Sequence, residues 1–197
     1  LLGVNDFTRV GGLRFRQVPG APLLDDGLLA APPVTSLRAL AAVSRRLEDP
    51  DAEELPEYEA WLAMLVAPGT ALGGARPKAN FTENDGSLWI AKFPSREDRY
   101  DVGGWEFLLH RLADKAHIDV PEARLERLTE RYSTFLVQRF DRTAVGRRMY
   151  SSAMTLLEHR DGDNASYLEL AEFIENNGAQ GRVKADLAQL FRRVVFN

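Results

Sequence analysis

Apolar residues recur every three or four positions in several stretches, which is the spacing of an α-helix with one buried face. The spacing predicts a first helix from Thr35 or Ser36, either of which could cap it. A second helix is predicted to begin near Pro56, a residue favoured in a first turn, and to end before Pro68. The expected buried positions are Leu37, Leu40, Val43 and Leu47 in the first helix, and Trp61, Leu62 and Leu65 in the second.

A third helix is predicted after Asp101, which is a suitable N-cap. Its apolar stripe contains an acidic residue, because Glu106 lies four positions after Val102 and three before Leu109. A buried charge is normally paired, so Glu106 is expected to have a cationic partner. The expected buried positions are Val102, Trp105, Leu108, Leu109, Leu112 and Ala113.

Two more helices are predicted near the end of the sequence. Ser166 and Glu169 form a capping-box pattern that opens a helix ending at Asn177-Gly178. The last helix reaches Asn197 without a stop signal, and the chain starts at Leu1 rather than Met, so we expect a fragment of a longer protein. Its expected buried positions are Val183, Leu187, Leu190, Phe191, Val194 and Val195.

Strand patterns occupy the middle of the chain. Asn84-Asp85-Gly86 is a strong turn signal between two extended segments, which predicts a β-hairpin. Its second strand, residues 87–93, would place Lys92 on one face with Leu88 and Ile90. Residues 118–128 and 133–140 also look extended, so the overall prediction is an α+β fold.

Composition narrows the class of protein. The 197 residues are 45% hydrophobic and 27% charged, contain no cysteine and include no apolar run long enough to cross a membrane. We therefore expect a cytoplasmic protein without a membrane partner. The net charge of −4 shows no concentrated basic segment typical of nucleic-acid binding, although an arginine cluster formed only in three dimensions remains open.

Three features point to phosphate chemistry. Small residues at 73–75 would let the backbone approach an anion. Lys92 continues an apolar strand face, and pairing it with Glu106 would compensate both charges and leave the ammonium beside a phosphate, as in protein kinases. Each feature alone also has an ordinary explanation: a loop, a solvated lysine, or a structural pairing of Glu106 with Arg111 or Arg124.

A family resemblance supports the phosphate hypothesis. Leu72-Gly73-Gly74-Ala75-Arg76-Pro77-Lys78 resembles the glycine-rich motif of HipA-type serine/threonine kinases, the toxins of toxin–antitoxin pairs. The resemblance covers most of residues 55–197, and residues 1–16 resemble the end of the family's N-terminal subdomain. Its other motifs are Trp89-Ile90-Ala91-Lys92-Phe93-Pro94, Trp105-Glu106-Phe107-Leu108-Leu109 and Val137-Gln138-Arg139-Phe140-Asp141-Arg142.

The resemblance implies a protein-kinase-like N-lobe with an antiparallel sheet, followed by the beginning of a helical C-lobe. Residues 1–54 would be the end of an accessory subdomain and a linker helix. Residues 55–140 would be the N-lobe, and residues 141–197 the truncated start of the C-lobe.

The resemblance also implies a nucleotide site. Lys92 would contact ATP phosphates with Glu106 as its ion-pair partner, and the backbone of residues 138–140 would form the hinge that binds adenine. For Asp141 a structural salt-bridge role is favoured over catalysis. The nucleotide-binding residues would be Leu72, Gly73, Gly74, Ala75, Arg76, Lys78, Lys92, Gln138, Arg139 and Phe140.

The implied activity is that of an ATP- and Mg²⁺-dependent serine/threonine kinase. The family's catalytic aspartate and metal ligands are expected beyond Asn197, so this fragment is expected to be inactive alone and to hold no metal. Ala71 stands where the family has a regulatory serine, and whether Thr70 replaces that serine is open.

The resemblance implies partners as well. They are a HipB-like antitoxin, DNA only through that antitoxin, and a protein substrate, for which the family's known targets suggest an aminoacyl-tRNA synthetase. The alternative hypothesis is a non-catalytic nucleotide- or antitoxin-binding scaffold, a pseudokinase.

Overall fold

The computed structural model describes residues 5–24, 31–60, 62, 65, 72 and 76–197. Two compact units are present: Leu1–Leu108 with Pro121–Met149, and Leu109–Val120 with Tyr150–Asn197. The domain boundaries expected after residues 54 and 140 stay predictions. No helix in the described part of the chain is long and apolar enough to cross a membrane.

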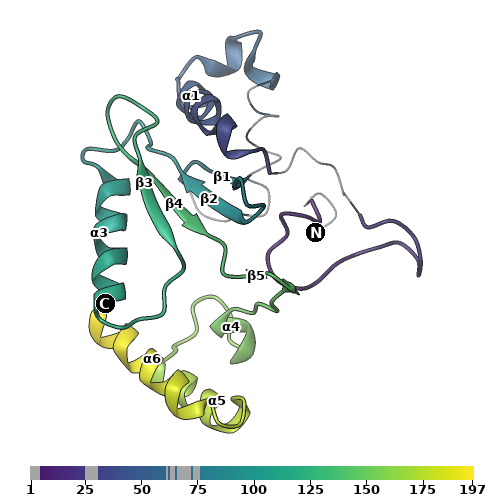
Figure 1. Cartoon of the computed structure of the whole chain (residues 1–197), viewed down its shortest axis with the longest axis vertical. Helices are drawn as coiled ribbons and strands as arrows, with labels where there is room; N and C mark the ends of the chain where they lie inside the picture. The colour runs from purple at the N-terminus through teal and green to yellow at the C-terminus, as the bar shows by residue number, and fades with distance from the viewer. Residues whose placement is uncertain (1–4, 25–30, 61, 63–64, 66–71, 73–75) are drawn as a thin grey trace. The chain divides into compact units, whose positions relative to one another are not determined.

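A four-stranded antiparallel sheet forms the centre of the first unit (Figure 1), which confirms the predicted α+β class. Its strands are β1 (Lys78–Thr82), β2 (Leu88–Lys92), β3 (Ala123–Glu126) and β4 (Thr134–Gln138), in the order β1-β2-β4-β3. A separate two-stranded ribbon, which the sequence did not predict, pairs β5 (Arg142–Thr143) with β6 (Gly146–Arg147).

The predicted hairpin joins β1 to β2. Gly86 has a φ of +83°, a left-handed conformation that glycine adopts without steric cost. The Asp85 carboxylate accepts hydrogen bonds from the Ser87 backbone N–H at 2.8 Å and from its hydroxyl at 2.6 Å. This turn sets a register in which Lys78 lies opposite Lys92 and Asn80 opposite Ile90.

Helix α1 (Leu37–Leu47) covers one face of the sheet. A short 3₁₀ turn, η2 (Val34–Ser36), precedes it, and η3 (Ala52–Glu54) follows. The predicted face was partly wrong: Ala41 and Ser44 are buried, while Val43 and Leu47 are only partly buried. Ser36 makes no side-chain cap. The shared core contains Leu37, Leu40, Ala41, Ala79, Phe81, Trp89, Ala91, Phe93 and Leu136.

Residues 58–60, 62 and 65 are helical, as expected for the helix that was predicted to begin near Pro56. Trp61 lies outside the described residues.

Helix α3 (Val102–Lys115) begins at the predicted cap. The Asp101 carboxylate accepts the Gly104 backbone N–H at 3.0 Å, and also the Ser133 N–H at 3.1 Å and hydroxyl at 2.7 Å. Burial opposes ionisation of Asp101, but these hydrogen bonds outweigh it and keep its pKa below the usual value. One carboxylate thus ends the loop, caps the helix and ties it to the start of β4.

The predicted buried stripe of α3 was largely wrong: of its positions, Ala113 is buried and Val102 is partly buried, and the others are exposed. Trp105, Leu108, Leu109 and Leu112 are between 44% and 56% exposed. The buried positions are Gly103 and Ala113, and Glu106, Phe107 and His110 are partly buried. Gly103 explains the shift, because a Cβ there would lie 2.3 Å from the Ser133 carbonyl oxygen. The helix backbone approaches β4 at the residue without a side chain, so the bulky residues lie elsewhere on the helix.

The second unit contains α4 (Ala153–Leu156), α5 (Tyr167–Asn177) and α6 (Val183–Phe196). The predicted capping box is present, with Ser166 and Glu169 each bonded to the other's backbone. Helices α5 and α6 pack together, and the Gln189 side chain bonds the His117 carbonyl and the Asp119 N–H at 3.0 Å each. The predicted buried face of α6 was wrong for Phe191, Val194 and Val195, which are exposed. Val183, Leu187 and Leu190 are partly buried.

Replacing Gly103 with alanine tests the close approach of α3 to β4. Gly103→Ala should lower the free energy of unfolding by about 1–3 kcal/mol, because the new methyl group meets backbone that cannot rotate away. Chemical denaturation followed by circular dichroism measures the change.

Gly104→Ala is the matched control, since its Cβ would meet only the Asp101 side chain, at 3.0 Å. It gains the same helix propensity, and its stability should change by less than about 1 kcal/mol. Equal effects of the two substitutions would contradict the close approach.

Candidate functional site

An ion pair joins the sheet to α3. Lys92, the last residue of β2, contacts the carboxylate of Glu106 in the second turn of α3. The Lys92 Nζ also lies 5.5 Å from the ring centroid of Phe135, its neighbour on β4. The pair is less buried than the sequence suggested, since 33% of the Lys92 side chain and 34% of the Glu106 side chain are exposed. An ammonium held in this way remains within reach of a ligand from solvent.

A second lysine lies beside this pair. Lys78 on β1 is directly opposite Lys92, so both side chains belong to the same face of the hairpin. Burial, reinforced by the positive charge of Lys92, holds the pKa of Lys78 below its usual value, and Glu106 offsets only part of this effect. Two ammonium groups therefore lie on one face of the hairpin, and their positive charge favours the binding of an anion there.

Arg76 anchors the stem of the predicted phosphate loop. Its guanidinium makes a bidentate pair with Asp98, with Nη1 2.6 Å from Oδ1 and Nη2 2.7 Å from Oδ2. Hydrogen bonds from Arg76 in turn hold the pKa of Asp98 below its usual value. Arg76 is thus engaged within the protein, which fixes the chain two residues before Lys78.

The tip of that loop lies outside the described residues: Thr70, Ala71, Gly73, Gly74 and Ala75. Leu72 is partly buried. A phosphate-binding role for these residues stays a prediction.

The predicted hinge continues the hydrogen bonding of the sheet. The Gln138 N–H donates to the Glu122 carbonyl at 2.8 Å, and the Arg139 N–H donates to the Leu88 carbonyl at 2.9 Å. Phe140 is 51% exposed. An adenine bound here would have to use other backbone atoms of this segment, so the hinge role also stays a prediction.

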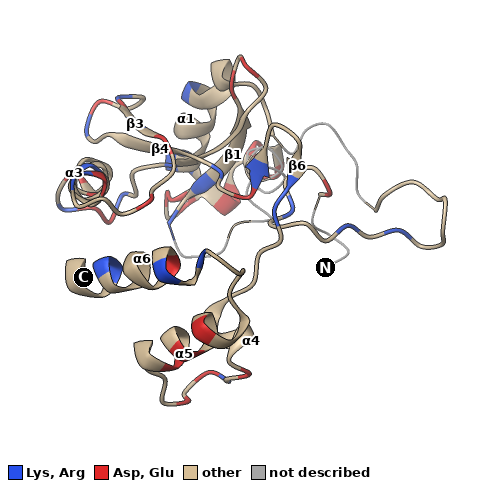
Figure 2. Ribbon diagram, turned by 60° about the horizontal axis from the view of Figure 1, so that its bottom comes forward, with Lys and Arg blue, Asp and Glu red and all other residues tan. Residues whose placement is uncertain are grey.

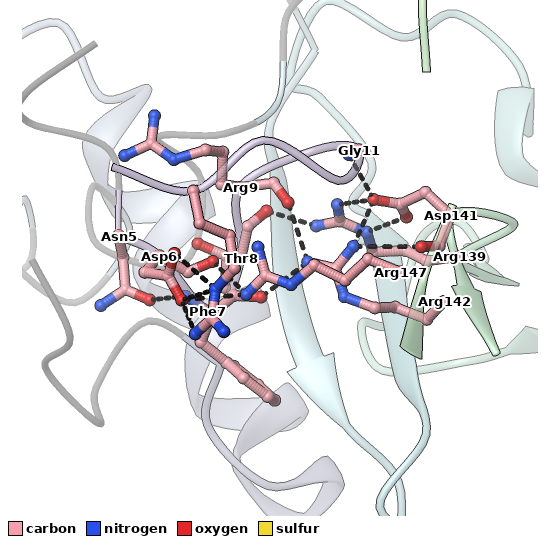
Figure 3. A network of polar contacts seen from close by, with 11 residues as sticks. Asn5, Asp6, Phe7, Thr8, Arg9, Gly11, Arg139, Asp141, Arg142 and Arg147 are labelled. Atoms are coloured by element: carbon pink, nitrogen blue, oxygen red, sulfur yellow. Dashed lines mark hydrogen bonds and ion pairs between the residues drawn. The ribbon is translucent and has the colours of Figure 1, made fainter. Parts of the chain in front are cut away.

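The Asp141 carboxylate, only 1% exposed, is the centre of a buried polar network (Figure 3). Arg139 donates to it in bidentate fashion at 2.8 and 2.7 Å. Arg142 donates to the same carboxylate at 2.5 Å, and the Gly11 backbone N–H at 2.8 Å. Every contact is structural, which agrees with the salt-bridge role favoured for Asp141 from the sequence.

The same arginines hold the segment of residues 5–14 against residues 139–147. Arg139 donates to the Thr8 carbonyl at 2.6 Å and to the Asn80 side chain at 2.8 Å. Arg142 donates to the carbonyls of residues 7 and 9, each at 2.8 Å. Arg147 also pairs with Asp6, at 3.0 Å (Figure 3). Within the segment itself, Arg14 pairs with Asp6 at 2.7 Å.

This connection was not predicted, because the contacts of Arg139 and Arg142 with residues 7–9 join positions more than 130 residues apart. No local pattern marks them.

A family model described as the HipA-like C-terminal domain matches residues 70–197, which is more than half of the chain. The chain belongs to this family. No curated protein matches this HipA-like chain, and no solved structure does.

The charges of this site suit an anionic ligand. Lys78 and Lys92 present two ammonium groups on one face, which suits the oxygens of a triphosphate. Among the described residues, no group of three or more His, Asp or Glu side chains is placed to hold a metal ion. We therefore assign no Mg²⁺ ligand in this part of the chain.

Asp141→Asn tests the buried network. The substitution should cost about 3 kcal/mol of unfolding free energy at pH 7, because it leaves Arg139 without its charge partner. Asp161→Asn, at an exposed turn position, should have little effect. Urea denaturation of both variants measures the difference, and equal stabilities would contradict the central role of Asp141.

The network also predicts a pH dependence. Burial opposes ionisation of Asp141, but hydrogen bonds and charge from its partners hold its pKa below the ordinary 3.8. Its stabilisation is therefore complete above that value and is lost as the pH falls through the lower folded pKa. Wild-type stability should fall as the pH drops below about 4, and less steeply in Asp141→Asn.

Proposed function

We propose that the protein containing this chain is an ATP-dependent serine/threonine kinase of the HipA type, with the four-stranded sheet and α3 as its kinase-like nucleotide-binding lobe. The observation that carries the proposal is the ion pair between Lys92 on a strand and Glu106 on the helix packed against it. Protein kinases need such a lysine–glutamate pair in place for phosphoryl transfer. Membership in the HipA-like family supports the same activity.

Lys92 would act by position and charge. Glu106 holds the ammonium at the end of β2, and Lys78 adds a second positive charge beside it. Together they would bind triphosphate oxygens and offset the negative charge that spreads over the transferred group. Mg²⁺, when bound, would supply the remaining neutralisation of the phosphates.

The reaction would transfer the γ-phosphoryl group to a substrate hydroxyl. The new P–O bond forms to the hydroxyl oxygen, the bond between the β–γ bridging oxygen and the γ-phosphorus breaks, and ADP leaves. The hydroxyl proton would pass to a general base, to which we assign no residue of this chain. Positioning by the lobe described here is the part that this chain contributes.

The proposed partners follow from the family. They are a HipB-like antitoxin, DNA reached only through that antitoxin, and a protein substrate of the aminoacyl-tRNA synthetase class, encountered in the cytoplasm.

Lys92→Ala tests the nucleotide site. ATP affinity of the 197-residue chain, measured by isothermal titration calorimetry with Mg²⁺, should fall by about tenfold or more, because a charge-assisted contact is lost. Glu106→Gln should reduce the affinity less, since it frees the ammonium without removing it. Lys115→Ala, at the exposed end of the same helix, is the matched control and should bind ATP like the wild type.

The titration also separates the two hypotheses. Wild-type chain without measurable ATP affinity would favour the antitoxin-binding scaffold, and equal affinities of Lys92→Ala and Lys115→Ala would exclude Lys92 from the site. Thermal melting of each variant establishes that a loss of binding is not a loss of folding.

A further inference from the structure

The first unit contains a cavity of about 740 Å³ whose walls are rich in arginine. One wall is α1, and the others are the loop that contains Arg96 and the loop of residues 127–130. A second cavity of about 250 Å³ shares Arg45, Arg96 and Thr129 with the first and adds Arg131 and Tyr132. Because the two cavities share these lining residues, they are together called the arginine-lined cleft below.

Positive charge exceeds negative charge in the larger cavity. Five arginines line it against two carboxylates, Asp49 and Glu130. Asp49 is already paired with Arg96. The other four guanidinium groups form no ion pair with any residue in the described part of the chain; they belong to Arg38, Arg45, Arg46 and Arg127.

The fold accounts for only part of this clustering. Arg45 and Arg46 lie in the last turn of α1, where the helix dipole favours cations. Arg38 lies in the first turn, where the dipole disfavours a cation, and Arg127 lies in a loop after β3. Cations gathered in one cavity repel one another unless an anion lies between them.

The walls of the cleft are held in place by the protein itself. The Arg96–Asp49 pair and the Arg96 N–H, which donates to Glu48 Oε2 at 2.6 Å, tie one loop to the end of α1. The Thr129 hydroxyl donates to the Tyr132 carbonyl at 2.9 Å and closes the other loop. A ligand would find the cleft already formed, which lowers the entropic cost of binding.

We propose that the arginine-lined cleft binds a compact polyphosphorylated small molecule, with two or more phosphoryl groups on one scaffold. The planar guanidinium fork matches phosphate oxygens in a bidentate manner. Arg38 and Arg45 are about 10 Å apart along α1, at about 1.5 Å per residue, which separates at least two phosphate positions. The volume of 740 Å³ is within the usual range of about 300–1,000 Å³ for small-molecule sites.

Charge distribution favours a compact ligand over a nucleic acid. The chain carries a net charge of −4, and acidic and basic residues are interspersed along it (Figure 2). A nucleic-acid surface needs a continuous basic track beyond a single cleft.

The arginine-lined cleft is distinct from the nucleotide site proposed above. Helix α1 packs on the sheet face that carries Ala79, Phe81 and Ala91. Lys78 and Lys92 alternate with these residues along β1 and β2 and therefore belong to the opposite face.

Calorimetric titration with inorganic tripolyphosphate tests the proposal. The titration is done in the Lys92→Ala background, which weakens binding at the candidate nucleotide site. The double substitution Arg45→Gln/Arg127→Gln should weaken binding by about tenfold or more, because two charge-assisted contacts are lost. Arg99→Gln, an exposed arginine that does not line the cleft, is the matched control and should leave affinity unchanged.

Three outcomes would overturn the proposal. They are no tripolyphosphate binding in the Lys92→Ala background, equal binding by the double variant and the control, and a single-stranded oligonucleotide that binds the cleft more tightly than tripolyphosphate. The last would replace it with a nucleic-acid site. If the double variant melts at a lower temperature than the control, the single substitution Arg38→Gln should still weaken binding severalfold, and its failure to do so counts against the cleft.

Discussion

A carboxylate can be buried only where donors replace its lost water, and Asp141 meets that condition with four of them. Arg139 supplies two, Arg142 one and the Gly11 backbone one. These donors come from the end of β4, from β5 and from the N-terminal segment. Displacing any of the three would leave the buried carboxylate with fewer donors, which is energetically costly. The arginines extend the constraint to the Thr8 carbonyl and to Asn80 on β1. One buried charge thus determines how the end of the inner strand β4 meets the N-terminal segment and β5.

The two faces of the sheet have different roles: one forms the hydrophobic core, and the other carries the candidate functional site. One face is apolar and packs with α1, and hydrophobic burial there provides the main favourable contribution to folding. The other face carries Lys78 and Lys92, and α3 brings Glu106 to it. Gly103 allows that approach, because any larger residue would hold α3 away from β4. The partial exposure of the ion pair follows from this arrangement and suits a site that receives an anion from solvent.

Local signals in the sequence predicted the elements well and their contacts less well. The Asn84-Asp85-Gly86 turn, the Asp101 cap and the Ser166 capping box all act within three residues, and all three are present. The Lys92–Glu106 pair was also predicted and is present. Each charge lies in an otherwise apolar sequence pattern, and a charge in such a place is normally paired.

Properties that depend on tertiary packing were missed. The spacing of apolar residues predicted that α3 is a helix but not which of its faces is buried. That face is set by the contact of Gly103 with Ser133, which is 30 residues away in the sequence. Two further features combine residues that are far apart in the sequence: the attachment of the N-terminal segment to Asp141, and the arginine-lined cleft. No short stretch of sequence contains a pattern that predicts either one.

The turn between β1 and β2 also determines which face of the sheet carries the two lysines, because it sets the register of the strands. Side chains alternate strictly along a strand, so moving β1 by one position against β2 would carry the Lys78 ammonium into the place of Ala79. An ammonium would then be forced among Phe81 and Ala91, and the opposite face would lose half of its paired lysines. A single-residue insertion or deletion in this turn that shifted the register would therefore be opposed by charge, whereas changes that preserve the alternation of the strands would not.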